Sequence, residues 1–410
     1  MITALFADSR GEIFDAPGIE ALARIGDRIV KLSPEDLIPL PETADLMYLP
    51  NRRAIGLKNG KQIELKGRAV SAILPVGFTR THLPAFKREK NSEMLPLFGY
   101  TSVVLYRDEL HVAAIRTDEN RKWNPDFYNT RSLRKLISRV KKDLPKNRLI
   151  DHLANCSLEW HCLTAQNIFY RRWECGIPTS PKCNANCLGC ISLQPAECCP
   201  SPQSRIEFKP TPEEIAELGI YHLSTAEDGI VSFGQGCEGE PSIAFKNISA
   251  GIKKIRESTS RGQINMNSNA GFTLGVQKII DAGLDSIRVS IISANDSTYQ
   301  KYYRSNYSLA NVKDSIRYAL DHGVYVSLNL LHFPGFNDRP EEIDAWLKFL
   351  EELPIQMIQI RNLNLDPDVF LETIGHSEKF LGTKKFIETL QKNFPKIQLG
   401  NFSHFTRNSI

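Results

Sequence analysis

Three cysteines stand within eight residues, at Cys183, Cys187 and Cys190, with gaps of three and then two residues. Thiolates are the usual ligands of iron–sulfur clusters, and a short loop with this spacing can bind one face of a cubane. Three ligands leave the fourth iron open to an external chelating molecule. Zinc is the alternative, but a structural zinc ion takes four protein ligands, often as two separated pairs. The spacing therefore favours an iron–sulfur cluster.

Further cysteines surround this loop in the sequence and could hold a second, auxiliary iron–sulfur cluster: Cys156, Cys162, Cys175, Cys198 and Cys199. The alternative is that they are small buried hydrophobic residues. Adjacent cysteines rarely ligate one cluster together, so the two interpretations remain equally open. The remaining cysteine, Cys237, is interpreted as a packing residue rather than as a radical-quenching thiol.

The composition is that of an ordinary globular protein, with 41% hydrophobic and 24% charged residues and a formal net charge of +4 over 410 residues. This length predicts two or three domains. The mild charge does not indicate a nucleic-acid or membrane binder. The N-terminus lacks the pattern of a signal peptide, and no apolar stretch reaches the ~18–20 residues of a membrane helix. We expect a cytoplasmic protein, in a reducing compartment where clustered cysteines bind metals.

Residues 1–125 are expected to form a β-rich module. Asn59-Gly60 separates two apolar stretches and is a strong hairpin signal, and residues 101–106 and 110–115 alternate as a second hairpin. Residues 126–176 are expected to form a helical linker region, with helices from about 130 to 144 and from about 148 to 170. The first helix has a basic face. We interpret it as a solvated surface, with a docking surface for an acidic partner as the alternative.

From about residue 177 onward, predicted strands alternate with predicted helices. Strands at 229–234, 263–268, 286–293, 324–332 and 356–363, with one more before the cysteine loop, make about six βα units. The predicted fold class is therefore α/β, with a partial (βα)6 TIM-type barrel over residues 177–370 and a helical and strand extension over 371–410. An open doubly wound sheet is the alternative. In either fold, ligands bind at the C-terminal ends of the strands.

Glycines and polar residues follow the second and third of these strands. Gly239 and Glu240 belong to the segment Gly-Glu-Pro, where glycine lets the backbone approach a ligand and carbonyls with a carboxylate suit a cation. Glu240 could equally cap the helix that follows. Asn267 and Asn269 end the third strand, where short amides can bond hydroxyl groups, although asparagines are also common in turns.

The cysteine spacing on a loop after the first strand, with these segments in order behind it, resembles the radical S-adenosylmethionine (SAM) superfamily over roughly residues 178–366. The resemblance implies a 4Fe–4S cluster held by the three cysteines, with SAM chelating the open iron through its amino and carboxylate groups. It also implies reductive cleavage of SAM to a 5′-deoxyadenosyl radical, which abstracts a substrate hydrogen. An external electron donor such as ferredoxin or flavodoxin, and work under anaerobic conditions, would go with that chemistry.

The resemblance also implies contacts to SAM. The Gly239-Glu240 segment would accept hydrogen bonds from the SAM ammonium, and Asn267 and Asn269 would touch the ribose or carboxylate. Ser290, at the end of the fourth strand, and Arg304 correspond to family positions near the SAM carboxylate, where an arginine forms a charge-assisted pair. An ordinary surface position is the alternative for Arg304.

Polar residues at the last two strand ends are the candidate substrate contacts. These are His332, after the fifth strand, and a group after the sixth: Arg361, Asn362, Asn364 and Asp366. A lone histidine at a strand end is more often structural, whereas Arg361 indicates an anionic group on the substrate. The substrate itself is not predicted beyond a peptide or protein, or a metabolite in cofactor biosynthesis, with an oxidoreductase or transferase outcome. A non-catalytic iron–sulfur carrier and a zinc-ribbon nucleic-acid binder are the alternatives.

Overall fold

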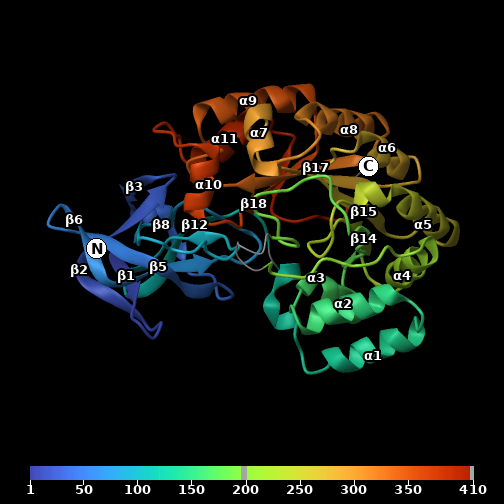
Figure 1. The fold of residues 1–410 in the computed structure, drawn as a ribbon, viewed down its shortest axis with the longest axis horizontal. Helices are drawn as coiled ribbons and strands as arrows, with labels where there is room; N and C mark the ends of the chain where they lie inside the picture. The colour runs from blue at the N-terminus through green and yellow to red at the C-terminus, as the bar shows by residue number, and fades with distance from the viewer. Residues whose placement is uncertain (120, 195–200, 407–410) are drawn as a thin grey trace.

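The computed structural model describes residues 1–119, 121–194 and 201–406. Figure 1 shows a β-rich module formed by the N-terminal third of the chain, beside a larger α/β unit whose helices lie along its outer side. Three helices that follow the module in sequence, α1 to α3, lie below the first strands of the α/β unit (Figure 1).

The N-terminal module is one antiparallel sheet. Its strands are β1 (Thr3–Ala7), β2 (Ile13–Ile25), β3 (Arg28–Lys31), β4 (Leu37–Pro39), β5 (Asp45–Lys58), β6 (Lys61–Ile73), β7 (Phe78–Arg80), β8 (Leu83–Pro84), β9 (Phe86–Arg88), β10 (Tyr100–Thr101), β11 (Val103–Tyr106) and β12 (Glu109–Arg116). A pairing between β6 and β1 closes the path β1-β2-β5-β6 on itself. Both predicted hairpins are confirmed, as β5–β6 and β11–β12. Asn59 and Gly60 have φ of 50° and 76°, the left-handed conformation that a two-residue hairpin turn requires.

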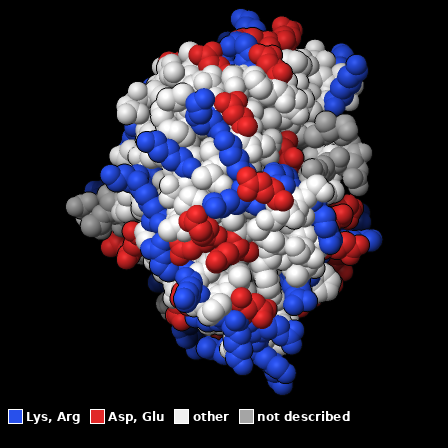
Figure 2. Space-filling model, turned by 90° about the vertical axis from the view of Figure 1, so that its right-hand side faces the viewer, with Lys and Arg blue, Asp and Glu red and all other residues white. Residues whose placement is uncertain are grey.

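Helices α1 (Leu133–Asp143), α2 (Arg148–Leu158) and α3 (Leu163–Tyr170) form the linker region. The prediction of a single helix over 148–170 is wrong. The helix is interrupted between α2 and α3, where His161 has a left-handed φ of 49°. Helix α1 buries Leu133, Ile137 and Val140 and exposes its basic side chains. Lysine and arginine side chains gather at the lower end of the molecule, where α1 lies (Figures 1 and 2).

The α/β unit is built on a parallel sheet whose strand order equals the sequence order. Its strands are β13 (Glu174–Gly176), β14 (Ile230–Phe233), β15 (Gln263–Ser268), β16 (Ser286–Ile291), β17 (Tyr325–His332), β18 (Met357–Asn362) and β19 (Gln398–Gly400). The described residues thus hold seven parallel strands where about six were expected. The extra strand, β19, lies in the helical and strand extension expected over 371–410 and pairs with β18, which adds it to the sheet.

Helices connect successive strands of this sheet. They are α4 (Pro212–Thr225), α5 (Phe245–Ser258), α6 (Thr273–Ile280), α7 (Asp296–Tyr303), α8 (Leu309–Asp321), α9 (Pro340–Glu352), α10 (Pro367–Ile374) and α11 (Thr383–Asn393), with short 3-10 turns at Pro34–Asp36, Arg121–Trp123, Pro125–Phe127 and Pro241–Ala244. Each step moves to the next strand in one direction, so right-handed crossovers place the helices on one side of the sheet. Helix α4 follows its N-cap Thr211, which forms a capping box with Glu214. In the described part of the chain, no helix has the length and apolarity to cross a membrane.

The other side of the sheet is polar, which is unusual for parallel strands. Ser232 donates to Glu174 (2.7 Å), and Asn265 donates to Ser232 (3.1 Å). Across the sheet, Arg288 on β16 donates to Gln359 on β18 (3.1 Å). Hydrogen bonds between strands therefore link these buried groups, and this polar side, away from the helices, leads toward the C-terminal ends of the strands.

The N-terminal module docks onto those C-terminal ends. Arg52 forms an ion pair with Asp366 (2.7 Å), with side-chain exposures of 1% and 0%, and Arg24 pairs with Asp368 (2.9 Å). The backbones of Gly26 and Gly335 approach so closely that a Cβ on Gly335 would lie 2.2 Å from the Gly26 nitrogen. Only glycine fits this contact, and the module is therefore an integral wall of the strand ends.

Candidate functional site

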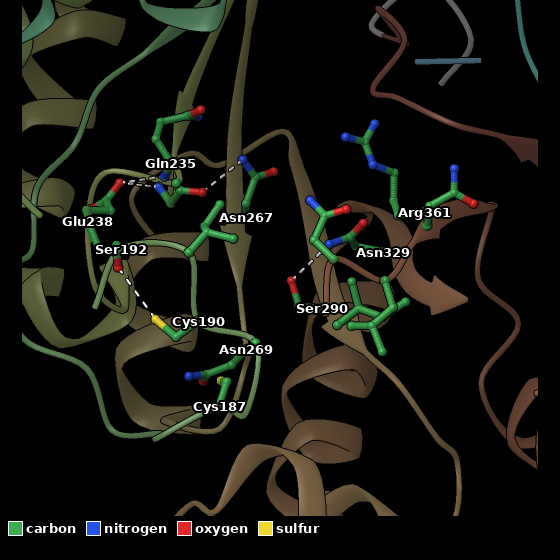
Figure 3. Close-up of a pocket in the computed structure, with 18 of the residues that line it drawn as sticks. Cys187, Cys190, Ser192, Gln235, Glu238, Asn267, Asn269, Ser290, Asn329 and Arg361 are labelled. Atoms are coloured by element: carbon green, nitrogen blue, oxygen red, sulfur yellow. Dashed lines mark hydrogen bonds between the residues drawn. The ribbon is translucent and has the colours of Figure 1, made fainter. Parts of the chain in front are cut away.

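A cavity of about 440 Å³ lies between the module and the C-terminal ends of β14 to β18. The three clustered cysteines, Cys183, Cys187 and Cys190, line it together with residues from all of these strand ends. Figure 3 shows Cys187, Cys190 and Asn269 on one side of this pocket and Arg361 on the opposite side. The wall that faces the strand ends comes from the module. It is largely apolar, with Leu74, Val76, Phe78 and Phe98.

The cysteine loop is fixed by backbone hydrogen bonds to two neighbouring segments. The amides of Asn186 and Leu188 donate to the carbonyls of Tyr303 (2.9 Å) and Tyr302 (3.0 Å) at the end of α7. On its other side, Gly239 and Glu240 donate to carbonyls at Ser180 (2.7 Å) and Lys182 (2.8 Å). The loop is therefore held in place by backbone contacts, and its thiols line the cavity.

The three thiols of the loop are more widely spaced than the ligands of one tetrahedral ion. Sulfur ligands of a tetrahedral zinc ion, at about 2.3 Å from the metal, lie roughly 3.8 Å apart. Among the described residues, the group that brings three possible ligand atoms within 4.8 Å of one another does not include Cys183, Cys187 or Cys190. Burial raises the pKa of Cys183 to about 11 and that of Cys187 well above its ordinary value. Buried thiolates therefore need a metal cation beside them, and the donor set fits an iron–sulfur cluster.

Glu240 and Gly239 both line the cavity, as predicted from the strand order, but the Glu240 carboxylate already has partners. It accepts hydrogen bonds from the Ser242 amide (3.0 Å), the Ser268 hydroxyl (2.5 Å) and the Asn269 amide (2.8 Å). Burial raises its pKa. It therefore caps the turn that follows, the alternative role that its position allowed, and also joins β14 to β15. A Cβ on Gly239 would lie 2.1 Å from the Lys182 carbonyl, so glycine is required there.

Glu238 is a site residue that the sequence interpretation missed. Its buried carboxylate accepts from the amides of Gly234 (2.6 Å) and Gln235 (2.8 Å) with one oxygen, and from Thr179 (amide 2.7 Å, hydroxyl 3.0 Å) and Ser180 (2.9 Å) with the other. Burial raises its pKa to about 7. It joins the segment before the cysteine loop to the glycine-rich loop after β14. Its signal in the sequence is its place in the run 233–241, directly before the Gly-Glu-Pro segment.

We predict that Glu238→Gln destabilises the folded protein by about 3 kcal/mol. The amide nitrogen of glutamine cannot accept, so two buried backbone donors lose their acceptor, at about 1–3 kcal/mol each. Urea unfolding of the full chain, compared with the wild type, measures the loss. Glu227→Gln is the control, because that glutamate is exposed; equal effects of the two substitutions would contradict this role of Glu238.

The predicted residues at the ends of β15 and β16 lie in the cavity wall. Asn267 donates to the Gly234 carbonyl (3.2 Å), and Asn269 donates to the side chain of Asn184 in the cysteine loop (2.7 Å). Ser290 accepts a hydrogen bond from Asn329 (3.3 Å). The side chains that line the cavity here are Asn267, Asn269, Ser290 and Asn329 (Figure 3). The amides thus hold neighbouring loops together and also border the space available to a ligand.

The two predicted arginines have different positions. Arg361 lines the cavity and donates to the Asn401 carbonyl (2.6 Å), and burial lowers its pKa to about 10. Arg304 ends helix α7 in a left-handed conformation (φ 47°), and the cavity lining does not include it. A cation that the prediction did not name is closer to the cysteines: Arg205 donates to the Cys190 sulfur (3.6 Å) and to Ser192 (3.1 Å).

The remaining candidate substrate contacts bind the N-terminal module or the protein interior. Asn362 accepts from the Arg80 amide (2.9 Å) and donates to the Phe78 carbonyl (3.0 Å), although it also borders the cavity with Asn364. The Asp366 carboxylate pairs with Arg52, accepts a hydrogen bond from the Leu95 amide (2.9 Å) and caps the N-terminus of α10. His332 is buried against Thr383 (3.0 Å), and burial lowers its pKa to about 3. Of these residues, Asn362 and Asn364 border the cavity, and the lining does not include Asp366 or His332.

Of the cysteines considered for a second cluster, no three that the structure describes place their sulfur atoms within 4.8 Å of one another. Cys175 lies in β13 and donates to the neighbouring Gly176 carbonyl (3.6 Å), and Cys162 lines a second cavity. Cys198 and Cys199 lie outside the described residues. Cys156 instead lies close to Cys237 and His152.

Residues 177–350 match the family model described as the radical SAM superfamily. An uncharacterized protein of Methanocaldococcus jannaschii is 23% identical over 275 residues, covering 62% of this chain and 84% of that protein. A probable GTP 3′,8-cyclase of Methanococcus maripaludis is 25% identical over 223 residues, covering 52% of this chain and 70% of that protein. A crystal structure of methylornithine synthase is 18% identical, with a TM-score of 0.40, over 64% of this chain and 78% of that one.

The matched range contains the cysteine loop and the strands β14 to β17, whose ends line the cavity. This superfamily uses a 4Fe–4S cluster and SAM. Residues 177–350 therefore form a radical SAM domain, and the protein is an enzyme whose motifs do not specify a subfamily.

Proposed function

We propose that this enzyme holds its 4Fe–4S cluster through Cys183, Cys187 and Cys190 and abstracts hydrogen from a carbon of a substrate bound between the sheet and the N-terminal module. The observation that carries the proposal is one shared cavity: the three thiols and the polar ends of β14 to β18 all line it. The fold would act as a partial barrel, with its polar interior open at the end where the module docks. When bound, the cluster supplies the electron that cleaves SAM reductively.

The residues around the thiols would bind and orient SAM. The backbone at Gly239 can accept from an ammonium group without steric hindrance, because nothing projects from its Cα. Asn267, Asn269 and Ser290 offer short polar groups for the ribose hydroxyls. Within the described ranges, Arg205 and Arg361 are the cations that line this cavity, so we assign the SAM carboxylate to Arg205, which already contacts Cys190.

The substrate would be held by the module wall. Leu74, Val76, Phe78 and Phe98 present apolar surface opposite the strand ends, while Arg361 also lines the cavity and would offer a cation to an anionic group. A substrate with an apolar part and a carboxylate or phosphate suits this pair of walls, whether it is a metabolite or a residue of a peptide. An external one-electron donor such as ferredoxin or flavodoxin would complete the reaction.

The test is formation of 5′-deoxyadenosine. The full-length protein, reconstituted anaerobically with iron and sulfide, should contain about four irons per chain in this cluster and should convert SAM to 5′-deoxyadenosine and methionine when dithionite is added. Omitting dithionite is the control. A reconstituted protein with four irons that produces no 5′-deoxyadenosine would count decisively against the proposal.

A further inference from the structure

Three metal-binding side chains meet at a place distinct from the cysteine loop. His152, Cys156 and Cys237 each place one possible ligand atom within 4.8 Å of the other two, and the distance from the Cys156 sulfur to His152 Nε2 is 3.5 Å. His152 and Cys156 are four residues apart on α2 and therefore share one face of the helix. Cys237 comes from the loop that follows β14, so two elements far apart in sequence supply the group.

The separation of these atoms suits a single ion. Ligands of a tetrahedral zinc ion, at about 2.3 Å for sulfur and 2.0–2.1 Å for nitrogen, lie roughly 3.5–3.8 Å apart. A side-chain adjustment of about 1 Å would bring the three atoms to that spacing. A cubane needs a wider arrangement of thiolates. The cysteine loop and this group thus differ in the kind of metal centre that their spacing allows.

The charges of such a site would balance. Two thiolates and a neutral imidazole bring two negative charges, which a divalent cation cancels, and binding releases two thiol protons to solvent. Cys156 and Cys237 are buried, with exposures of 1% and 4%, so a neutral assembly is the form that burial favours. Phe208 packs edge-on against His152, with a centroid distance of 6.4 Å, and the Ile206 amide donates to the Cys237 carbonyl (2.7 Å).

We propose that His152, Cys156 and Cys237 bind one divalent thiophilic ion, zinc before others. Three protein ligands leave a fourth coordination position. A cavity of about 370 Å³ reaches Cys237 and is also lined by Cys162 and Thr164. The ion would attach α2 to the glycine-rich loop that also carries Glu238, and so would connect the linker region to the site at the strand ends. This site does not depend on the proposed radical chemistry.

The test is metal content in full-length protein purified anaerobically. In the variant Cys183→Ala/Cys187→Ala/Cys190→Ala, which lacks the loop thiols, we expect about one zinc per chain. Adding Cys156→Ser or Cys237→Ser should reduce this at least fivefold, whereas adding Cys175→Ala, a buried thiol in β13, should leave it unchanged. Loading with Co²⁺ should give the intense visible bands and thiolate charge-transfer absorption of a tetrahedral site.

Three results would overturn the proposal: about four irons with sulfide in the triple variant, which would indicate a second cluster; a Cys156–Cys237 disulfide in the anaerobically purified protein, detected by mass; or zinc that Cys156→Ser and Cys237→Ser leave in place. Should either serine variant unfold by circular dichroism, His152→Gln replaces it. His152 is only partly buried, so this change removes a ligand without opening the core.

Discussion

Alanine in place of Cys187 is expected to remove the iron of the proposed radical cluster and to abolish formation of 5′-deoxyadenosine, at least a thousandfold below the wild type. Cys187 is the middle ligand of the loop and borders the cavity. With two thiolates left, the loop no longer encloses one face of a cubane. Iron and sulfide analysis after anaerobic reconstitution measures the first effect, and chromatography of the SAM cleavage products measures the second.

Cys175→Ala is the matched control for this experiment. It removes a buried cysteine from the neighbouring strand β13, where the thiol contacts only the backbone carbonyl of Gly176 among the hydrogen bonds described. It should keep the iron and the activity. Loss of iron in both variants to the same extent would mean that the thiols act by packing, whereas full activity of Cys187→Ala would place the cluster elsewhere.

Arg52→Met is expected to destabilise the docking of the N-terminal module by about 3–5 kcal/mol, because it leaves the Asp366 carboxylate buried without its cation. The pair is fully buried, and Arg52 also donates to the carbonyls of Pro50 (3.0 Å) and Glu93 (2.8 Å). Urea unfolding followed by tryptophan fluorescence gives the loss. Limited proteolysis should show earlier cleavage between module and linker.

The double substitution Arg52→Met/Asp366→Asn separates an uncompensated charge from lost packing. The Asp368 amide donates to one Asp366 oxygen (2.9 Å). An asparagine at position 366 can still accept this hydrogen bond through its side-chain oxygen, but it carries no charge. Part of the lost stability should therefore return, since replacing both members of a buried ion pair is often nearly neutral. The recovery is incomplete because the Leu95 amide, which donates to the other Asp366 oxygen (2.9 Å), loses its acceptor. A double variant as unstable as Arg52→Met would assign the effect to the lost contacts of the arginine itself.

The order of the strands and the position of the cavity could be predicted from sequence, because parallel strands end at one edge of the sheet. That rule brought Asn267, Asn269, Ser290 and Arg361 to one cavity. It also placed Asp366 among the substrate contacts, which is wrong, because a polar residue after a strand looks the same in sequence whether it faces a ligand or another part of the protein. Only the tertiary structure shows that Arg52, from the module, lies opposite it.

Two further features were missed for the same physical reason. Glu238 accepts hydrogen bonds from backbone amides of two segments, one before the cysteine loop and one after β14, and backbone donors leave no trace in the side-chain pattern. The pair His152 and Cys156 has the spacing of two ligands on a helix, but the third member, Cys237, belongs to a different element. Periodicity describes single elements, so groups assembled from distant segments require the fold.

The docked module also has a consequence for the order in which the chain is made. Arg52 and Asp366 are separated by 314 residues, and Gly77 and Asn401, which are joined at 2.9 Å, by 324. At about 5–20 residues per second, roughly 15–60 s pass between synthesis of the two sides of each contact. The cysteine loop leaves the ribosome during that interval, before β18 exists to receive the module. Cofactor insertion during synthesis would therefore meet an uncovered loop, and release of the finished chain would close it.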